Sequence, residues 1–421
     1  MRKIGFLAGC AAVVLVACHP VTPAVEGLPR VRPEEVGMDA ARLARIDSVV
    51  LDAVQKGDVP GAVVGVVRGD NIVYLKALGY KSTVPDTVAL TEDTLFDLAS
   101  VSKCVGTTLS FLQLVEQGFV RLTDPVSRYI PGFLPWTDPD TGEPDAITIQ
   151  DLLTHSSGLD PYVDVSAFVR RYGENTPDSL LQFIATQAGR HFKPGTDVLY
   201  SCLNFVTLQH VLQKVTGERL CDYAQHHVFD ALGLRHTCYF PLAGTAPSCP
   251  AADRLAPLCA PTEVQDDGLP LVAAVHDPLA RLINAGNAGN AGVFSTAGDL
   301  CVMAAAILGG GAVHGMRILG PETVRLMLTI PADNDPRVAR ALGWDTYARY
   351  PGTSGDIFPR EHTVGHTGYT GPSLLIDPDT QTAVVILCHR VHPADKGSTA
   401  RLRAVIANIV AGAITGSAAG C

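Results

Sequence analysis

The sequence predicts an α+β fold in which one antiparallel sheet, flanked by helices, is built from both ends of the chain around an all-helical insertion. The composition, 47% hydrophobic and 18% charged residues, is typical of a folded chain rather than a disordered or fibrous one. The length of 421 residues fits one large domain or two closely packed domains. Strand patterns lie near both termini with helical periodicity between them, so we expect both sets of strands in one sheet.

The net charge of the chain indicates which classes of partner it can bind. Acidic residues number 42 and basic residues 32, which gives a formal charge of −10. Nucleic-acid-binding proteins usually present a basic surface. The sequence has no cluster of Lys and Arg that could form one, so we expect no nucleic-acid partner. The only long apolar run is N-terminal, and the body is therefore not expected to cross a membrane repeatedly.

The N-terminus has the pattern of a lipoprotein signal. Arg2 and Lys3 precede an apolar stretch, Ile4 to Val16, that is too short to span a bilayer comfortably. Leu15-Val16-Ala17-Cys18 resembles the bacterial lipobox, in which the cysteine is acylated before cleavage. The similar motif at Cys10 leaves only about four apolar residues before cleavage, too few for a signal core.

We therefore predict a signal peptide over residues 1–17, lipidation at Cys18 and a tether over 18–32. A plain secretory signal is the alternative. Lipidation would anchor the protein to the membrane through acyl chains rather than through a spanning helix. The expected location is the bacterial cell envelope, on the periplasmic side of the outer or inner membrane.

The cysteines do not indicate a metal site. Cys249 and Cys259 lie in one Pro- and Ala-rich segment and could pair in an oxidising compartment. Their spacing to Cys238 matches no zinc finger or ribbon. His362 and His366 would form a zinc pair only on a helix, and a strand is predicted there. We expect no metal and no cofactor.

The first part of the chain alternates helix and strand. Residues 41–56 carry apolar residues at helical spacing and end at Gly57. Two β-branched runs within 61–80 flank Arg68-Gly69-Asp70-Asn71, which predicts a hairpin. Residues 100–118 are apolar on all sides, and this predicts a buried helix that ends at Gly118.

The rest of the chain completes the pattern. Residues 145–235 are mostly helical by periodicity, most clearly at 178–189 and 204–217, and 241–272 are predicted as a long loop. Further helices are expected at 297–309, 321–329 and 398–412, and strands at 362–369, 373–378 and 382–389. The predicted domain spans 33–421, with an α/β part at about 33–135 and 280–415 and a helical insertion at about 136–279.

Ser100-Val101-Ser102-Lys103 is the first candidate for chemistry. Positions i and i+3 of a helix share one face, so Lys103 can lie beside the Ser100 hydroxyl. A serine hydroxyl needs a base to become a nucleophile. Burial in apolar surroundings disfavours the charged ammonium and makes a neutral amine accessible. The alternative is a capping serine and a lysine that extends to solvent.

Two further motifs carry polar groups that could act with this pair. Tyr200 follows a turn and precedes a predicted helix, where a phenol could relay protons beside a cation; a buried structural tyrosine is the alternative. His366-Thr367-Gly368 lies in a predicted strand, and Gly368 removes a side chain where a ligand could approach. His366 could donate a hydrogen bond or carry charge, or it could be an ordinary strand histidine.

Taken together and in this order, the three motifs resemble those of the serine β-lactamase-like superfamily, within its branch of class C β-lactamases, D-alanyl-D-alanine carboxypeptidases and family VIII-type esterases. The resemblance covers about residues 33–415. It extends to DLLTHSSGL at 151–159, PGTDVLYS at 194–201, AGVFSTAGDL at 291–300, GHTGYTG at 365–371 and HRVHP at 389–393.

The resemblance implies a β-lactamase/transpeptidase-like fold and a set of roles. Ser100 would be the acylated nucleophile, Lys103 its base and Tyr200 the proton shuttle to the leaving group. His366 would head the strand that binds the substrate. The oxyanion would be held by the backbone N–H groups of Ser100 and of a residue near Tyr369, just after Thr367 and Gly368.

Two positions depart from the family pattern. Many relatives have Asn where this chain has Cys202, and a thiol cannot make the amide's paired hydrogen bonds with a substrate. His366 replaces a lysine, which weakens the fixed positive charge that would meet a substrate carboxylate. Both departures favour esters or small peptide-like substrates over β-lactams.

We therefore expect a serine hydrolase that cleaves a small ester, an amide or a peptidoglycan fragment through an acyl-enzyme on Ser100, with esterase-like preference. The alternatives are a D-Ala-D-Ala carboxypeptidase or a weak β-lactamase. An alternative of another class is a non-catalytic lipoprotein that binds cell-wall fragments.

Overall fold

A computed structural model describes residues 27–240, 252–346 and 354–417. The predicted signal peptide at 1–17 and the predicted lipidation site Cys18 lie outside the described residues. Most of the predicted tether and Cys249 also lie outside them.

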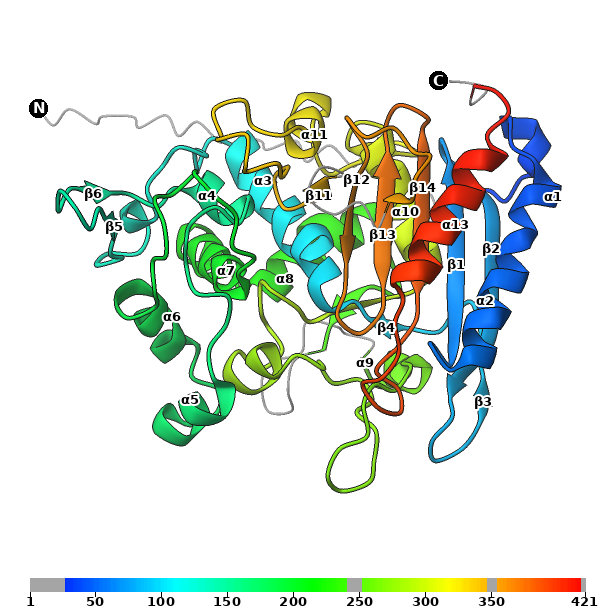
Figure 1. The fold of residues 1–421 in the computed structure, drawn as a ribbon, viewed down its shortest axis with the longest axis horizontal. Coiled ribbons are helices and arrows are strands. Elements are labelled where there is room, and N and C mark those ends of the chain that lie inside the picture. The colour runs from blue at the N-terminus through cyan, green and yellow to red at the C-terminus, as the bar shows by residue number, and fades with distance from the viewer. Residues whose placement is uncertain (1–26, 241–251, 347–353, 418–421) are drawn as a thin grey trace, which may run out of the picture.

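The two ends of the chain meet in one antiparallel sheet, which confirms the predicted fold class (Figure 1). Its central pairing joins an early strand to a late one, with Val63 opposite Leu387. In order across the described sheet, the strands are β11 (Asp345–Thr346), β12 (Val364–Thr367), β13 (Ser373–Asp377), β14 (Thr382–Leu387), β1 (Gly61–Arg68), β2 (Asn71–Ser82) and β3 (Val88–Ala89).

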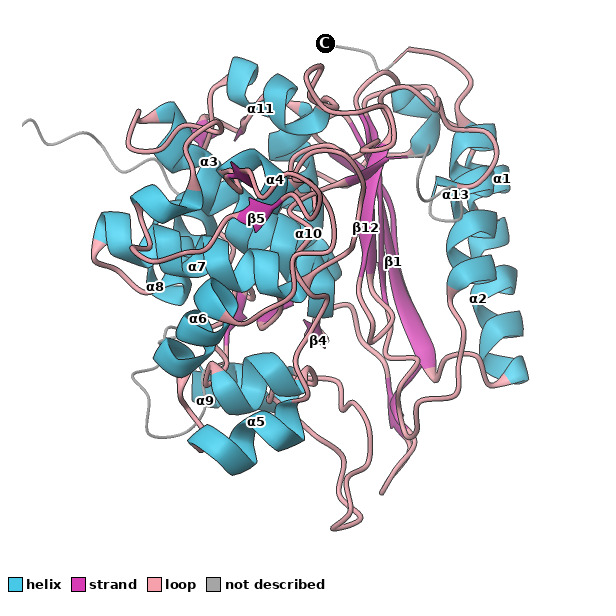
Figure 2. Ribbon diagram, turned by 60° about the vertical axis from the view of Figure 1, so that its left-hand side comes forward, coloured by secondary structure: helices cyan, strands magenta, loops and turns pink. Residues whose placement is uncertain are grey.

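One face of the sheet is covered by the terminal helices α1 (Ala40–Leu43), α2 (Arg45–Lys56) and α13 (Ala400–Ala413) (Figure 2). Ile46 of α2 and Ile406 of α13 pack with Val64 of β1 in one apolar cluster. The helix α2 ends at Gly57, whose φ of 77° is left-handed, as its sequence predicts.

The other face of the sheet is covered by α10 (Ala297–Leu308), most of which is buried. Gly65 of β1 allows this approach, because a Cβ at that position would lie 2.6 Å from Cys301 Sγ. With helices on both faces, every residue of β1 and of β14 is buried. This explains why both strands read as continuous apolar runs.

Other α-helices of the described residues gather beside α10, on the side of the sheet away from α13 (Figure 2). They are α3 (Leu109–Glu116), α4 (Ile149–Leu153), α5 (Val165–Tyr172), α6 (Pro177–Thr186), α7 (Cys202–Thr216), α8 (Leu220–Ala224), α9 (Ala252–Leu255) and α11 (Pro321–Leu328). Within the described ranges, no helix combines the length and apolarity needed to cross a bilayer.

Short strands also occur in and around the segment predicted as a helical insertion. β5 (Trp136–Thr137) pairs with β6 (Pro144–Asp145), and β7 (Cys238–Tyr239) pairs with β8 (Val293–Ser295), which also pairs with β4 (Phe96–Asp97). The small pair β9 (Ala312–Val313) and β10 (Met316–Arg317) follows α10. Elements of two or three residues leave no alternating pattern in a sequence.

The predicted helix at 100–118 is not uniform. It begins as a 3₁₀ turn (Ala99–Val101), continues as a π-helix (Lys103–Thr108) and becomes α-helical only in α3. The apolar pattern does not distinguish these forms. A π-helical turn inside a helix is frequent at functional sites, and this one carries Lys103.

Candidate active site

Ser100 lies in a constrained turn between β4 and the π-helix. The preceding residue, Ala99, has a φ of 45°, a left-handed conformation that is uncommon for any residue with a Cβ. Its N–H donates to Asp97 Oδ1 at 2.8 Å, and the Thr370 hydroxyl donates to the Asp97 carbonyl at 2.9 Å. These contacts hold the turn, and so the nucleophile candidate, in a fixed position.

Lys103 lies beside Ser100. Its Nζ is 3.0 Å from Ser100 Oγ and 2.9 Å from the backbone carbonyl oxygen of Asn290, and its side chain is fully buried. Ser102 has a different environment, since its hydroxyl accepts a hydrogen bond from the Val293 N–H at 3.0 Å. The i, i+3 spacing therefore predicts the correct serine, because Ser100 is the one that lies next to the Lys103 amine.

Opposing effects set the protonation of Lys103. Burial lowers its pKa, but attraction to Cys202 and Tyr200 outweighs burial and raises the pKa above the ordinary lysine value. That attraction requires a thiolate or a phenolate. Burial raises the pKa of both the Cys202 thiol and the Tyr200 phenol, so both groups are neutral near pH 7. At that pH burial is opposed only by the smaller contributions of the Tyr200 hydrogen bond and the Asp277 charge, so burial favours the neutral amine.

Tyr200 completes the cluster. Its ring centroid lies 5.0 Å from Lys103 Nζ, and its hydroxyl is within hydrogen-bonding reach of Lys103 and Ser100. Burial raises its pKa to about 12, although the lysine acts in the opposite direction. Tyr200 is therefore a neutral phenol at physiological pH and can both donate and accept a proton.

His155, which the sequence argument did not single out, supports Tyr200. The two rings stack at 4.3 Å. The His155 Nδ1 accepts a hydrogen bond from the Ser201 N–H at 3.0 Å and lies 3.3 Å from Asn204 Nδ2. Burial lowers the pKa of His155 far below the usual value, so the ring is neutral. Its only sequence signal is its place in DLLTHSSGL.

His366 lies behind Tyr200 rather than in the open pocket. The rings are 6.0 Å apart, and the Nδ1–H of His366 donates to the Thr367 carbonyl at 2.9 Å. Burial lowers the pKa of His366 to about 4. Of the roles considered for His366, donating a hydrogen bond is therefore favoured over carrying charge near neutral pH, because the ring is buried.

A buried ion pair near Tyr200 and His366 also escaped the sequence argument. Arg340 is fully buried and donates to Asp345 of β11. The guanidinium carbon lies 5.9 Å from the Tyr200 ring centroid. The positive charge of Arg340 contributes to the lowered pKa of His366. The side chain with a permanent positive charge on this side of the cluster is therefore Arg340, and not His366.

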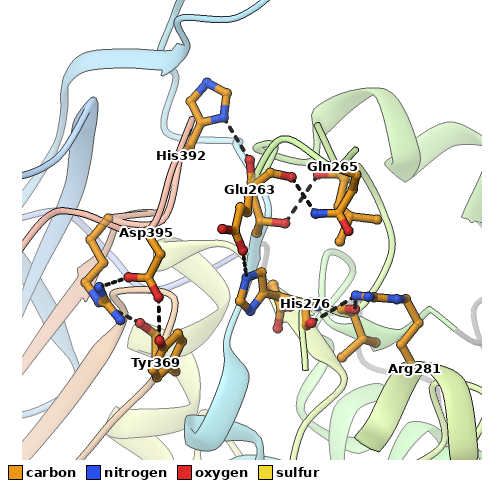
Figure 3. Close-up of polar contacts among 12 residues, drawn as sticks. Glu263, Gln265, His276, Arg281, Tyr369, His392 and Asp395 are labelled. Atoms are coloured by element: carbon orange, nitrogen blue, oxygen red, sulfur yellow. Dashed lines mark hydrogen bonds and ion pairs between the residues drawn. The ribbon is translucent and has the colours of Figure 1, made fainter. Parts of the chain in front are cut away.

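The end of β12 docks against the nucleophile turn. A Cβ at Gly368 would lie 2.5 Å from the Leu98 carbonyl oxygen, so only glycine fits. The next residue, Tyr369, is 58% exposed. Its hydroxyl donates to Asp395, and its ring stacks on His276 at 6.0 Å (Figure 3). This places Tyr369 at the mouth of the site.

A cavity of about 430 Å³ opens over Ser100. Three of the predicted residues, Tyr200, Cys202 and Tyr369, line it with Ser100, whereas His366, Thr367 and Gly368 are not among its lining residues. Cys202 Sγ lies 3.7 Å from Lys103 Nζ. The rest of the described lining comprises Ala99, Tyr162, Glu263, His276, Asp277, Pro278, Asn290, Ala291 and Asp395.

Comparison with known proteins finds a family match over most of the chain. The sequence model of the family described as Beta-lactamase matches residues 46–408. An Escherichia coli K12 protein with the provisional name D-alanyl-D-alanine carboxypeptidase is 28% identical over 396 residues, which cover 90% of each chain. Its Salmonella enteritidis counterpart, provisionally named in the same way, is 29% identical and covers 86% of this chain and 85% of its own.

Solved structures show the same fold. EstCE1, described as a hydrolase with promiscuous acyltransferase activity, has a TM-score of 0.67 and 25% identity, covering 88% of this chain and 99% of its own. The LovD6 mutant of the simvastatin synthase from Aspergillus terreus has a TM-score of 0.66 and 21% identity, covering 89% of this chain and 98% of its own. At that identity the likeness concerns the fold alone.

Proposed function

The chain belongs to the beta-lactamase family of serine hydrolases, and on that premise we propose that it cleaves an ester or amide through an acyl-enzyme on Ser100. The observation that carries the proposal is the 3.0 Å approach of a fully buried Lys103 Nζ to Ser100 Oγ. A hydroxyl beside a buried amine is an activated nucleophile.

In the acylation step, the neutral Lys103 amine takes the Ser100 proton as Oγ attacks the substrate carbonyl. The bond from the carbonyl carbon to the leaving group breaks, and the leaving group takes a proton from Tyr200. Lys103 returns the proton to Tyr200. Water then attacks the acyl carbon and gives a proton to Lys103 and Tyr200. The bond from the acyl carbon to Ser100 Oγ breaks, Oγ takes that proton back, and the acid is released.

The developing negative charge requires fixed donors. We assign these to the backbone N–H groups of Ser100 and Tyr369, as the family resemblance implies. Gly368 supports the assignment, because its missing Cβ lets the end of β12 approach the turn before Ser100. Donors held in place before the reaction stabilise an oxyanion without reorganisation.

We propose that neutral esters are preferred to anionic β-lactams. Cys202 stands in the pocket with only a weak donor. His366 is neutral and is not in the pocket lining. The lining carries the carboxylates of Glu263, Asp277 and Asp395, which would oppose the carboxylate of a penicillin.

A D-Ala-D-Ala carboxypeptidase is the second candidate, favoured by the provisional names of the related proteins. Its substrate ends in a free carboxylate, which would also meet the acidic lining. Hydrolysis of an acyl-D-Ala-D-Ala peptide, measured beside an aryl ester and a cephalosporin, ranks these activities.

We also propose that the protein is held at the periplasmic side of the cell envelope by lipid on Cys18. The support is the sequence Leu15-Val16-Ala17-Cys18 after a short apolar run.

The central test is intact-mass spectrometry of protein quenched during turnover of p-nitrophenyl butanoate. We expect a mass increase equal to one butanoyl group, located on the peptide that contains Ser100 and absent from Ser100→Ala. An acyl group on another residue, or turnover retained by Ser100→Ala, would refute the proposal.

A further inference from the structure

The cavity over Ser100 carries more negative than positive charge. Glu263, Asp277 and Asp395 line it, and His276 is the single titratable nitrogen in the described lining. Glu263 and Asp277 belong to one segment of the chain and Asp395 to another, and all three line the cavity. Figure 3 shows Glu263 and Asp395 on the side of the cavity where Tyr369 lies.

Two of the three carboxylates already have basic partners. Glu263 Oε2 lies 3.2 Å from His276 Nε2. Asp395 forms an ion pair with Arg390 and accepts the Tyr369 hydroxyl. These pairs reduce the capacity of Glu263 and Asp395 to bind another cation.

Asp277 has neutral partners. Its Oδ2 accepts the Tyr162 hydroxyl at 2.8 Å, and its Oδ1 accepts the Ala280 N–H at 2.8 Å and Asn290 Nδ2 at 3.0 Å. It forms no ion pair with another described residue. Nearby Arg281 donates instead to the carbonyls of Val275 and His276. The charge of Asp277 therefore remains without a counter-ion at a contact distance.

Asn290, beside Asp277, has an acceptor without a donor. The residue is 1% exposed and lines the cavity, yet its Oδ1 has no hydrogen-bond partner within the described part of the chain. Its Nδ2 is directed to Asp277, which fixes which end of the amide is the acceptor. A buried carbonyl without a donor is unusual, and it is explained if a bound substrate supplies the donor.

These two residues adjoin the catalytic group. The backbone carbonyl of Asn290 lies 2.9 Å from Lys103 Nζ. The negative charge of Asp277 contributes to raising the pKa of both Lys103 and Cys202. A group bound by Asp277 and Asn290 would therefore lie near the scissile carbonyl.

We propose that Asp277 and the side-chain carbonyl of Asn290 bind a protonated amine on the acyl part of the substrate, which makes the preferred substrate an aminoacyl ester or amide. The inference rests on the proposed serine hydrolase function and adds the substrate class. An ammonium has three donors and no acceptor, which matches a carboxylate beside an unpaired carbonyl. An acyl group ending in a carboxylate is repelled by the same residues.

The test compares two p-nitrophenyl esters of equal size, 3-aminopropanoyl and butanoyl, in which an ammonium replaces a methyl group. After subtraction of uncatalysed hydrolysis, we expect kcat/KM to be about tenfold or more higher for the amino ester, the effect of one desolvated charge pair. Asp277→Asn should remove most of this preference. Asp86→Asn, which removes the same charge at an exposed position outside the cavity, should keep it.

A second measurement needs no variant. Butylammonium should inhibit hydrolysis of the butanoyl ester by the wild-type protein more strongly than butanol does, and it decides the question if Asp277→Asn fails to fold. Equal kcat/KM for the two esters in the wild type, or equal inhibition by the two compounds, overturns the amine site and leaves the serine hydrolase intact. If neither ester is turned over and neither acylates Ser100, both proposals are overturned.

Discussion

The imidazole ring of His155 stacks on the phenol ring of Tyr200 with 4.3 Å between centroids and 30° between planes. The phenol lies next to the Ser100–Lys103 pair. His155 is itself fixed by the Ser201 N–H at 3.0 Å. We infer that it is a positioning residue, which sets the orientation of the phenol without contacting the substrate.

His155→Ala is expected to lower kcat by about tenfold to a hundredfold with little change in KM, because a displaced Tyr200 transfers its proton poorly while the cavity keeps its shape. The alkaline limb of the kcat–pH profile should shift, which loss of packing alone would not cause. His210→Ala is the matched control, since His210 is also a buried histidine but lies outside the cavity lining. Equal effects of the two substitutions on kcat would argue against the positioning role.

Ser100→Ala should abolish turnover and leave the protein folded. Lys103→Ala should lose nearly as much activity, and the double variant should be no worse, because the two residues act as one unit. The measurements are kcat/KM for an aryl ester and the circular dichroism spectrum of each variant.

Ser102→Ala is the matched control for the nucleophile. It should retain activity and lose about 1–3 kcal/mol of stability, since it leaves the buried Val293 N–H without an acceptor. An inactive Ser102→Ala beside an active Ser100→Ala would show that the wrong serine has been assigned.

The buried histidines predict a loss of stability on mild acidification. Burial lowers the pKa of His366 to about 4, below the unfolded value of about 6.5. The unfolded state therefore binds more protons between these values, and the stabilising contribution present above pH 6.5 is lost as the pH falls towards 4. For one histidine the loss is about 3 kcal/mol.

Urea unfolding at pH 5 and pH 7 measures this effect. The free energy of unfolding of His366→Gln should change less between the two pH values than that of the wild type. Identical pH dependence in the two proteins would show that the burial of His366 does not contribute to the pH dependence of the free energy of unfolding.

Substrate preference gives a further prediction. The wild type should hydrolyse short-chain aryl esters and show little or no turnover of benzylpenicillin. Cys202→Asn should shift the ratio of kcat/KM values towards β-lactams, because an amide supplies the donor and acceptor that a thiol lacks. Equal efficiency of the wild type on both substrates would contradict the argument.

His366→Lys would restore the lysine of the family pattern at the second departing position. His366→Lys would place an ammonium at a buried position close to Arg340, whose charge already acts on His366. We expect Cys202→Asn with His366→Lys to shift the same ratio further but to lower the melting temperature.

Membrane fractionation tests the anchor. Cys18→Ser should release the protein from the membrane fraction, whereas Cys10→Ser should not, because Cys18 is the predicted acylation site. Release by Cys10→Ser alone would move the cleavage site upstream.

The sequence predicts well those features whose signal is local. The continuous apolar runs of β1 and β14 and the helix end at Gly57 appear in the structure where the pattern places them. The i, i+3 spacing of Ser100 and Lys103 likewise anticipates their 3.0 Å contact. In each case the signal comes from residues a few positions apart or from burial of the whole element.

Features that depend on tertiary packing were not predictable. The left-handed Ala99 and the π-helix at Lys103–Thr108 follow from tertiary contacts, which override the local preference. His155 and Arg340 become recognisable only when the fold brings them to Tyr200. The charge state of His366 depends on its burial, and a strand pattern does not report which of its faces is covered.

The pairing of β1 with β14 also governs when the chain can fold. The β1–β2 hairpin is synthesised first, but the edge of β1 that contains Val63 can pair only after Leu387 of β14 has been synthesised. Contacts so distant in sequence form slowly, and until then an apolar strand edge is open to other chains. A chain cut short before β14 would expose that edge permanently, so truncation there should yield aggregates rather than a smaller folded unit.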